Sequence, residues 1–279
     1  MPDPPRAGAS APRAPRTAHN LGMTANATPL PPRTPAWRLD GAAPAETLSA
    51  QGFVRLAPTE TFLAAGIEST DFAALARHWS DLPPDEHLRD GGRYRFRRHA
   101  SLVLSADGTR IERTVDRPHW QPTDYNALHG GVERRFAPVT GATLAEPALR
   151  GLVLGLGRVA SAALGHVLPF VEVHQFRIDT TEGIGRPTPE GAHRDGVDAV
   201  AVVLVDRVDV RGGETRVFEA EGPAGLRFTM ATPGTALLLD DARMIHETTP
   251  LQPDGRPGHR DTVVLTWRRE GFLDPPPTS

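Results

Sequence analysis

Two stretches of the chain carry apolar residues at the spacing of one helix face. The first predicts a helix that Ser69 or Thr70 caps and that Pro83-Pro84 terminates. Its apolar positions, at i, i+3, i+4 and i+7, are Phe72, Leu75, Ala76 and Trp79. The second stretch predicts a helix over about 146–164 that ends at Gly165. Its apolar face comprises Leu149, Leu152, Val153, Leu156 and Val159.

The other patterned segments are short apolar runs or alternate between polar and apolar residues, as β-strands do. Two of them precede the second helix, at 92–98 and 101–115. Six follow it, at 171–178, 199–205, 214–219, 226–231, 236–239 and 261–268. Glycine and proline turns separate these six segments. Short strands at this spacing predict a mainly β domain with flanking helices, folded as a jelly roll (a double-stranded β-helix) or a small barrel.

Residues 1–36 differ in composition from the rest of the chain. They hold nine of the 28 prolines, four arginines and a single acid, Asp3, with few large apolar side chains. Such a segment cannot bury enough apolar surface to offset the entropy lost on ordering. We therefore expect a disordered Pro/Arg-rich tail at 1–36 and one jelly-roll domain at 37–279.

Composition excludes several classes of chemistry. The chain contains no cysteine, and all 31 basic residues are arginine, so disulfides, thiolate nucleophiles, a Walker lysine and Schiff-base chemistry are absent. The formal net charge is -3, and no window holds 18 uninterrupted apolar residues. We therefore expect a small-molecule partner, with neither a nucleic-acid partner nor a membrane span, and a cytoplasmic location. The oligomeric state stays open.

The candidate chemistry begins with two triplets, His193-Arg194-Asp195 and His259-Arg260-Asp261. In an extended segment, residues i and i+2 point the same way, so His193 and Asp195 can present an imidazole and a carboxylate to one ion. A second imidazole, His246, follows 51 residues after Asp195, whereas the second triplet has no histidine downstream. Two imidazoles and one carboxylate form the facial triad of non-haem Fe(II) oxygenases.

An arginine follows this triad at the start of an apolar strand. Arg260 lies 14 residues beyond His246, and Thr262 shares its strand face. A planar guanidinium with a nearby hydroxyl suits the far carboxylate of a dicarboxylate co-substrate, through a bidentate ion pair and one further hydrogen bond. Arg177 is the alternative for this role.

These residues resemble the 2-oxoglutarate/Fe(II)-dependent dioxygenase family. Four segments are similar to the branch of bacterial free amino-acid hydroxylases that contains L-isoleucine 4-hydroxylase, namely 189–198, 212–215, 246–250 and Arg260-Asp261. The likeness continues upstream and spans roughly residues 50–268. Its upstream matches are Arg93-Tyr94-Arg95, Gln121, Tyr125-Asn126, Gly130-Gly131 and His174-Gln175.

The resemblance implies a catalytic centre in which His193, Asp195 and His246 bind Fe(II). It further implies that Arg260 binds the distal carboxylate of 2-oxoglutarate and that O2 is the second co-substrate. Thr262, on the same strand face, is our additional candidate for binding 2-oxoglutarate. The implied activity is hydroxylation of an aliphatic C–H of a free L-amino acid.

A free amino acid needs an acid for its ammonium group and an arginine for its carboxylate. Our candidates are Glu190 for the former and Arg93 or Arg95 for the latter. Gln121 and Gln175 are further candidates for substrate contact, although His174 and Gln175 occupy opposite strand faces, so at most one of the two faces the pocket. Two alternatives remain, a substrate that is a peptide or a carrier-tethered residue, and a non-catalytic jelly-roll binding module.

Deletion of residues 1–36 should leave the melting temperature and activity nearly unchanged, because the segment offers little apolar surface to bury. Thermal denaturation and an activity assay of the shortened protein beside the full chain test this. A loss of several degrees would show that the segment packs on the domain.

Overall fold

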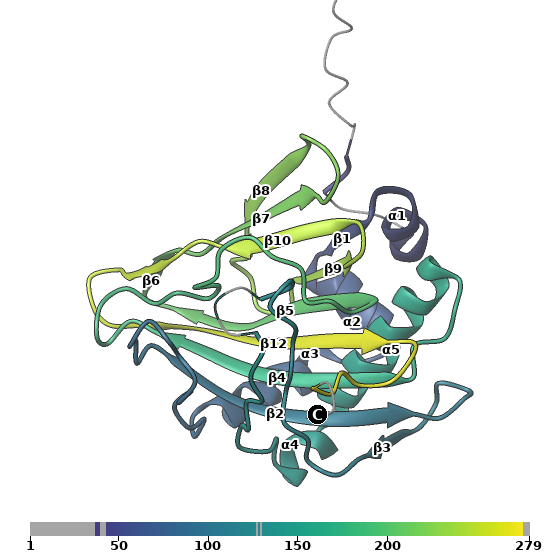
Figure 1. Cartoon of the computed structure of the whole chain (residues 1–279), viewed down its shortest axis with the longest axis horizontal. Helices are drawn as coiled ribbons and strands as arrows, with labels where there is room; N and C mark the ends of the chain where they lie inside the picture. Colours follow the sequence, from purple (N-terminus) through teal and green to yellow (C-terminus); the bar gives the residue numbers. More distant parts are fainter. Residues whose placement is uncertain (1–36, 40–42, 127, 129, 276–279) are drawn as a thin grey trace, which may run out of the picture. The chain divides into compact units, whose positions relative to one another are not determined.

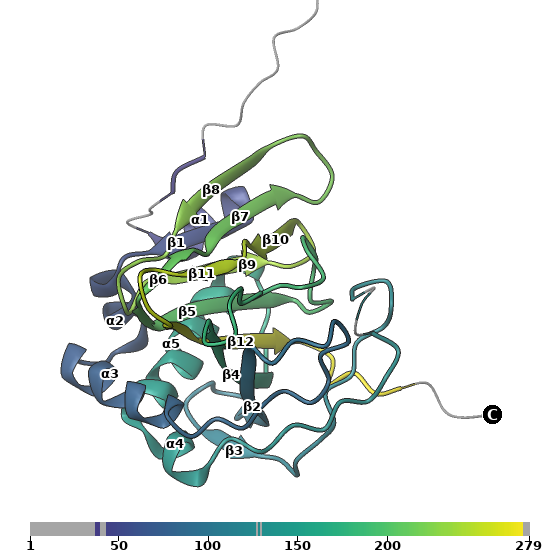
Figure 2. The same ribbon diagram turned by 90° about the vertical axis from the view of Figure 1, so that its left-hand side faces the viewer.

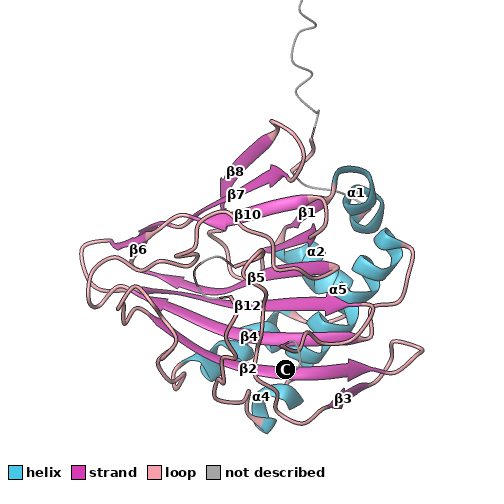
Figure 3. Ribbon diagram, in the orientation of Figure 1, coloured by secondary structure: helices cyan, strands magenta, loops and turns pink. Residues whose placement is uncertain are grey.

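The computed structural model describes residues 37–39, 43–126, 128 and 130–275, so the tail predicted at 1–36 lies outside the described residues. Figure 3 colours the helices cyan. They are α1 (Pro44–Gln51), α2 (Pro58–Ala65), α3 (Ser69–Leu75), the 3-10 helix η1 (Ala76–Trp79), α4 (Gly141–Ala145) and α5 (Pro147–Leu164).

The strands, magenta in Figure 3, dominate the domain. They are β1 (Phe53–Leu56), β2 (Arg95–Leu104), β3 (Ile111–Arg113), β4 (Phe170–Asp179), β5 (Ala199–Val208), β6 (Val210–Gly212), β7 (Glu214–Glu219), β8 (Gly225–Thr229), β9 (Ala236–Asp240), β10 (Met244–Thr248), β11 (Leu251–Pro253) and β12 (His259–Arg268). The predicted mainly β architecture with flanking helices is confirmed.

Seven strands form one antiparallel sheet in the order β1-β9-β5-β12-β4-β2-β3. Figure 1 shows its long strands β5, β12, β4 and β2 running across the view, one below another. Two smaller antiparallel sheets consist of β10-β7-β8 and β11-β6. Because β12 lies at the middle of the large sheet, its side chains are surrounded by those of β5 and β4. The site described below lies between this large sheet and β10.

Helices cover one face of the large sheet (Figure 2). The main apolar core joins the buried face of α5 to the strand residues that point toward it, among them Val173, Val263, Leu265 and Trp267. A Cβ at Gly157 of α5 would lie 2.8 Å from Trp267 Nε1, which shows how closely α5 approaches β12. Among the described helices, α5 alone has the length and mean hydropathy (1.2) of a membrane span, but 44% of it is buried in the protein, as in a core helix.

The opposite face of the same strands is polar, since successive side chains alternate between faces. On β12, Val263, Leu265 and Trp267 belong to the core, whereas Arg260 and Thr262 line a cavity. The same alternation holds on β4 and β2. The large sheet therefore has an apolar face for stability and a polar face for chemistry.

The predicted helices and strands are present, with corrections at their ends. The helix α5 begins at Pro147 and ends at a left-handed Gly165, as predicted. The helix α3 begins at Ser69, and its N-cap position is Glu68 with no capping side chain, so the predicted cap at Ser69 or Thr70 is wrong. The extended backbone of Glu68 makes it the N-cap residue. Ser69 and Thr70 are therefore already inside the first turn, where their hydroxyls do not occupy the capping position.

The two strands predicted before α5 are present with a different boundary between them. The segments 92–98 and 101–115 become the continuous strand β2 and the short β3, with Gly108 in a left-handed turn between them. Polar residues interrupt the apolar pattern of β2, which is why the pattern predicts a break there. Arg95, Arg97, His99 and Ser101 are nevertheless buried. Sequence reasoning did not predict β10, which carries His246, nor α1, α2 and α4.

Replacement of Gly155 by Ala should destabilise the domain by about 1–3 kcal/mol, although alanine favours helices. A Cβ at Gly155 would lie 2.3 Å from the Ala64 carbonyl oxygen and 2.5 Å from the Ala65 Cα of α2. Gly141→Ala is the matched control, because nothing lies within 4 Å of its Cβ position. Denaturant unfolding that ranks the Gly155 variant as stable as the Gly141 variant would contradict this account of α2–α5 packing.

Candidate active site

A cavity of about 110 Å³ opens between the polar face of the large sheet and the segments that cover it. Strands β2, β4, β5 and β12 supply one wall. The other walls come from β10, from the irregular segment after β3 and from the segment between β4 and β5. The charged lining residues are Arg95, Arg97, His119, Arg134, Glu172, His174, Glu190, His193, Asp195, His246, Arg260 and Arg268.

The first group in this cavity is His193, Asp195 and His246. One ligand-capable atom from each lies within 4.8 Å of the other two. Asp195 places one carboxylate oxygen 3.8 Å from His193 Nε2 and the other 3.8 Å from His246 Nε2. Two imidazoles and a carboxylate therefore converge at a spacing that one metal ion can bridge.

Backbone pairing brings the two histidines together. His193 and His246 exchange both backbone hydrogen bonds, at 3.0 and 2.9 Å, in an isolated antiparallel bridge. The His193 Nδ1–H lies 2.9 Å from the Gly191 carbonyl oxygen, to which it can donate. With the proton on Nδ1, the neutral ring carries its free lone pair on Nε2, the atom available to a metal ion.

Asp241 holds the backbone around Asp195. Its carboxylate accepts hydrogen bonds from the backbone N–H groups of Asp195, Gly196 and Val197, at 2.9, 2.7 and 3.0 Å. Burial and the neighbouring Asp195 raise the pKa of Asp241. On the other side, Gln121 Nε2 donates to the Asp195 carbonyl oxygen at 3.2 Å. The loop that carries Asp195 is thus fixed from two directions.

The surroundings shift the pKa values of the two histidines in opposite directions. Burial, with repulsion from His193, lowers the pKa of His246 to about 4, so this imidazole is neutral near pH 7. Burial opposes the charged form of His193, but the Asp195 and Glu190 carboxylates raise its pKa. A divalent cation between the rings replaces the proton that these carboxylates attract.

The arginine predicted to bind a co-substrate lies in the same cavity. Arg260 is 3% exposed, and its Nε and Nη2 have no hydrogen-bond partner among the described residues. Burial, with repulsion from Arg207, lowers its pKa to about 10, so it remains charged at neutral pH. Thr262 lines the same cavity, whereas Arg177 is bound to Asp261 through two hydrogen bonds of 2.8 and 2.7 Å.

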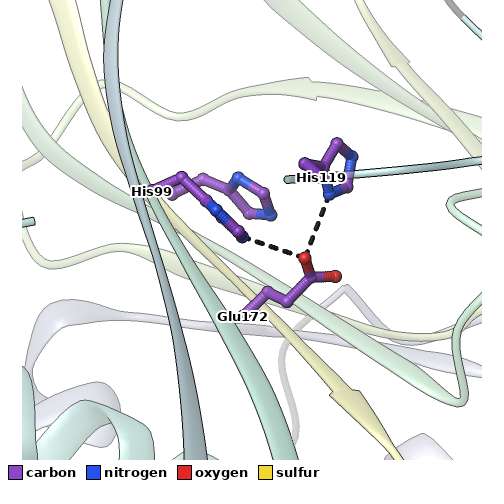
Figure 4. Close-up of side chains that lie close together, drawn as sticks. His99, His119 and Glu172 are labelled. Atoms are coloured by element: carbon purple, nitrogen blue, oxygen red, sulfur yellow. Dashed lines mark hydrogen bonds and ion pairs between the residues drawn. The ribbon is translucent and has the colours of Figure 1, made fainter. Parts of the chain in front are cut away.

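A second histidine group lies deeper in the cavity wall. Figure 4 shows His99 and His119 converging on one carboxylate oxygen of Glu172, at 2.9 and 3.1 Å. With His174 these residues also offer atoms within 4.8 Å of one another. Burial alone would raise the pKa of the Glu172 carboxyl, but His119 and His99 hold that pKa well below its usual range.

Protonation distinguishes this second group from the first. The Arg97 Nη2–H donates to His174 Nδ1 at 2.7 Å, so Nδ1 carries no proton and Nε2 must carry it in the neutral ring. Burial lowers the pKa of His174 well below its ordinary value, which keeps that ring neutral. His174 therefore offers no free lone pair, and the arginine beside it disfavours a cation. We interpret the group as a hydrogen-bonded network.

The structure brings most of the predicted site residues together. His193, Asp195, His246, Arg260 and Thr262 line the cavity, as do Glu190, Arg95 and Gln121. Two predicted site residues lie outside the cavity. Arg93 is exposed at the surface, and Gln175 lies on the other face of β4, where its Nε2 donates to the His78 carbonyl oxygen at 3.0 Å.

Sequence reasoning missed several cavity residues, and strand alternation is the signal that could have found some of them. Arg97 shares a face with Arg95 on β2, and Glu172 shares a face with His174 on β4. No such pattern marks His119 and Arg134, because both lie in the long irregular segment after β3.

Comparisons with known proteins agree with this geometry. A family model described as 2OG-Fe dioxygenase matches residues 76–266. No curated protein matches the chain. A bsmA homologue from Methylobium petroleophilum PM1 is 48% identical, over 85% of this chain and 96% of that one, with a TM-score of 0.79.

Two more distant structures share the fold. IDO from Bacillus thuringiensis is 16% identical, over 84% of this chain and 99% of that one, with a TM-score of 0.66. TqaL, an Fe(II)/α-ketoglutarate-dependent dioxygenase, is 17% identical, over 81% and 85%, with a TM-score of 0.58. The predicted jelly-roll fold is thereby confirmed. The chain belongs to the 2OG-Fe dioxygenase family, whose members use Fe(II), 2-oxoglutarate and O2.

Proposed function

We propose that this dioxygenase hydroxylates an aliphatic C–H of a free L-amino acid, with Fe(II) held by His193, Asp195 and His246. The observation that carries the proposal is that this group and the unpaired Arg260 open into one cavity. A metal centre and an anion site in one cavity suit a reaction that couples a metal to a dicarboxylate co-substrate.

The donor set fits Fe(II). Two neutral imidazoles and one carboxylate on one side of an ion leave its other side open for small molecules. Bound Fe(II) and 2-oxoglutarate supply, with O2, an oxidant for an unactivated C–H, while the co-substrate becomes succinate and CO2. The chain's own residues hold and orient these partners, since the hydroxylated carbon is set by placement.

Arg260 fits the far carboxylate of 2-oxoglutarate. Its unpaired Nε and Nη2 lie on one edge of the guanidinium, the edge that binds a carboxylate with two parallel hydrogen bonds. Thr262 follows two residues along β12 on the same face and adds a hydroxyl. Arg177 is poorly placed to substitute, because Asp261 already occupies its guanidinium.

The charged lining of the cavity supports a free small molecule. Several arginines and the acid Glu190 line it, and a free amino acid carries both a carboxylate and an ammonium group that can pair with them, whereas a peptide-internal residue carries neither. We therefore favour a free amino acid over a peptide or a carrier-tethered residue. We further propose a cytoplasmic enzyme without a nucleic-acid or membrane partner.

Mass spectrometry with the twenty L-amino acids and cyclic proline homologues tests the function. We expect one oxygen to be added to an aliphatic or cyclic aliphatic substrate, with matching succinate, only when both Fe(II) and 2-oxoglutarate are present. Oxygen gain on peptides or carrier-bound residues alone would replace the free-substrate proposal, and no oxygen gain on any of them would refute hydroxylation.

His193→Ala, Asp195→Ala and His246→Ala should each abolish succinate formation in a folded protein, because each removes one of three protein ligands. His166→Gln, at a partly exposed histidine outside the cavity, is the matched control and should retain turnover. Wild-type succinate production by any of the three alanine variants would contradict the ligand set.

Asp241→Asn should weaken Mn(II) binding about 10–100-fold, because an amide oxygen cannot replace a carboxylate that accepts three backbone N–H groups behind Asp195. Calorimetric titration with Mn(II) measures this, with the exposed Asp116→Asn as control. Equal Mn(II) affinity in a folded Asp241→Asn protein would show that the loop needs no such support.

Arg260→Lys should raise the dissociation constant for 2-oxoglutarate about tenfold or more while metal affinity changes little, since an ammonium keeps the charge but loses the two-pronged match. Titration of 2-oxoglutarate into the Mn(II)-loaded protein measures the effect. Arg113→Lys, at an exposed arginine on β3, is the control. An unchanged affinity in the Arg260 variant would move the co-substrate site elsewhere.

A further inference from the structure

Three more arginines converge on the cavity beside the proposed metal centre. Arg95 and Arg97 extend from β2, Arg134 comes from the irregular segment that follows β3, and each is 5% exposed or less. Asp85 pairs with two of them, at 2.7 Å from Arg95 Nε and 3.8 Å from Arg97 Nη1, while Glu172, whose charge also acts on Arg97 and Arg134, is hydrogen-bonded to His99 and His119. Buried cations at this density need an anion.

The guanidinium groups retain unused hydrogen-bond donors. Arg95 Nη2, Arg97 Nε and Arg134 Nε are buried and have no acceptor within the part of the chain that the structure describes. A buried charged donor without an acceptor destabilises the protein, because it has lost its hydrogen bonds to water. A bound carboxylate removes that cost.

Arg97 is held rigidly in place. Its guanidinium carbon lies 3.6 Å from the centroid of the Phe136 ring and 4.4 Å from that of Phe176. Its Nη2 is anchored on His174. These two ring contacts and the hydrogen bond to His174 restrict the guanidinium, which lowers the entropy lost when it binds a carboxylate.

The arginines lie next to the metal group and apart from Arg260. Arg134 Nη2 donates to Gln121 Oε1 at 2.8 Å, and Gln121 in turn donates to the Asp195 carbonyl oxygen. Arg260 is on β12, and β4 separates that strand from β2. The three arginines and Arg260 thus reach the cavity from different strands and segments.

An acid with one unsatisfied carboxylate oxygen, Glu190, lines the same cavity as these arginines. Glu190 Oε2 is buried without a partner among the described residues, and its Oε1 lies 3.6 Å from His193 Nε2. Its charge acts on Arg134, where it opposes the lowering of that pKa by burial. A cationic donor on the substrate can therefore find an acceptor close to the arginines.

We propose that Arg95, Arg97 and Arg134 form the subsite for the α-carboxylate of the primary substrate, and that Glu190 accepts its α-ammonium group. This assignment rests on the proposed function and specifies its substrate class as free α-amino acids. A peptide-internal residue presents a neutral amide and a carrier-tethered residue a neutral thioester, so either leaves the buried arginines without their anion. The subsite therefore disfavours them by its charge.

Binding without turnover tests the subsite. The full chain is loaded with Mn(II), a redox-inert substitute for Fe(II), and 2-oxoglutarate, and calorimetry then measures binding of the twenty L-amino acids. The tightest binder is compared with its carboxamide and its N-acetyl derivative. We expect each derivative to bind the wild-type protein at least about tenfold more weakly, which is the usual loss for one charge-assisted pair.

A variant adds a second measurement. Arg134→Lys should weaken amino-acid binding about tenfold and leave 2-oxoglutarate affinity within about twofold, because the ammonium loses the fork geometry in this subsite alone. Arg227→Lys, at a side chain 74% exposed on β8, is the matched control and should bind like the wild type. Because the derivatives are tested on wild-type protein, the comparison does not depend on the folding of any variant.

The outcomes separate the two proposals. Equal affinities for acid and carboxamide overturn the carboxylate subsite, and equal affinities for the amine and its N-acetyl derivative overturn the role of Glu190. Binding of 2-oxoglutarate without binding of any amino acid overturns the substrate class and leaves the metal and co-substrate sites standing. Failure to bind 2-oxoglutarate overturns the proposed function itself.

Discussion

Side-chain alternation along the strands of the large sheet is the constraint on which the site depends. Each strand of β2, β4 and β12 presents apolar residues to the helical layer and polar residues to the cavity. A register shift of one residue would exchange Trp267 for Arg268 in the core. The packing of α5 therefore determines indirectly which side chains reach the cavity, because it requires the odd-numbered face of β12.

A polar face that is also buried must find partners for its charges. Asp85, His174 and Gln121 satisfy part of the arginine donors, and His99 and His119 satisfy Glu172. The donors left over on Arg95, Arg97, Arg134 and Arg260 are informative because they are buried and belong to residues that line one cavity. We infer ligands from these atoms, a dicarboxylate at Arg260 and an amino acid at the arginines of β2.

The two histidine groups show how hydrogen bonds assign chemistry to similar residues. His193 can use Nδ1 to donate to a backbone carbonyl, which leaves Nε2 as a ligand atom. His174 has Nδ1 occupied as an acceptor from Arg97, so its other nitrogen is protonated. Proximity alone would treat both groups as metal sites, whereas the proton positions favour the group that contains Asp195.

Local sequence patterns predicted α5, most strands and the triad spacing, because each depends on short-range periodicity. They also led to Arg260 and Thr262, two residues apart on one strand. The patterns could not place Arg134 or His119, whose irregular segment reaches the cavity through long-range contacts. Gln175 was expected near the substrate, but strand alternation directs it to the helical side. The charged face of β2 has the composition of a surface, and only the covering segments bury it.

Anomalous diffraction from a crystal of the full chain, grown without O2 in the presence of Mn(II) and 2-oxoglutarate, tests the account most directly. We expect one Mn(II) peak in the cavity, bounded by His193, Asp195 and His246, with the far carboxylate of 2-oxoglutarate on Arg260. A peak among His99, His119 and Glu172, with none at the first group, would contradict it.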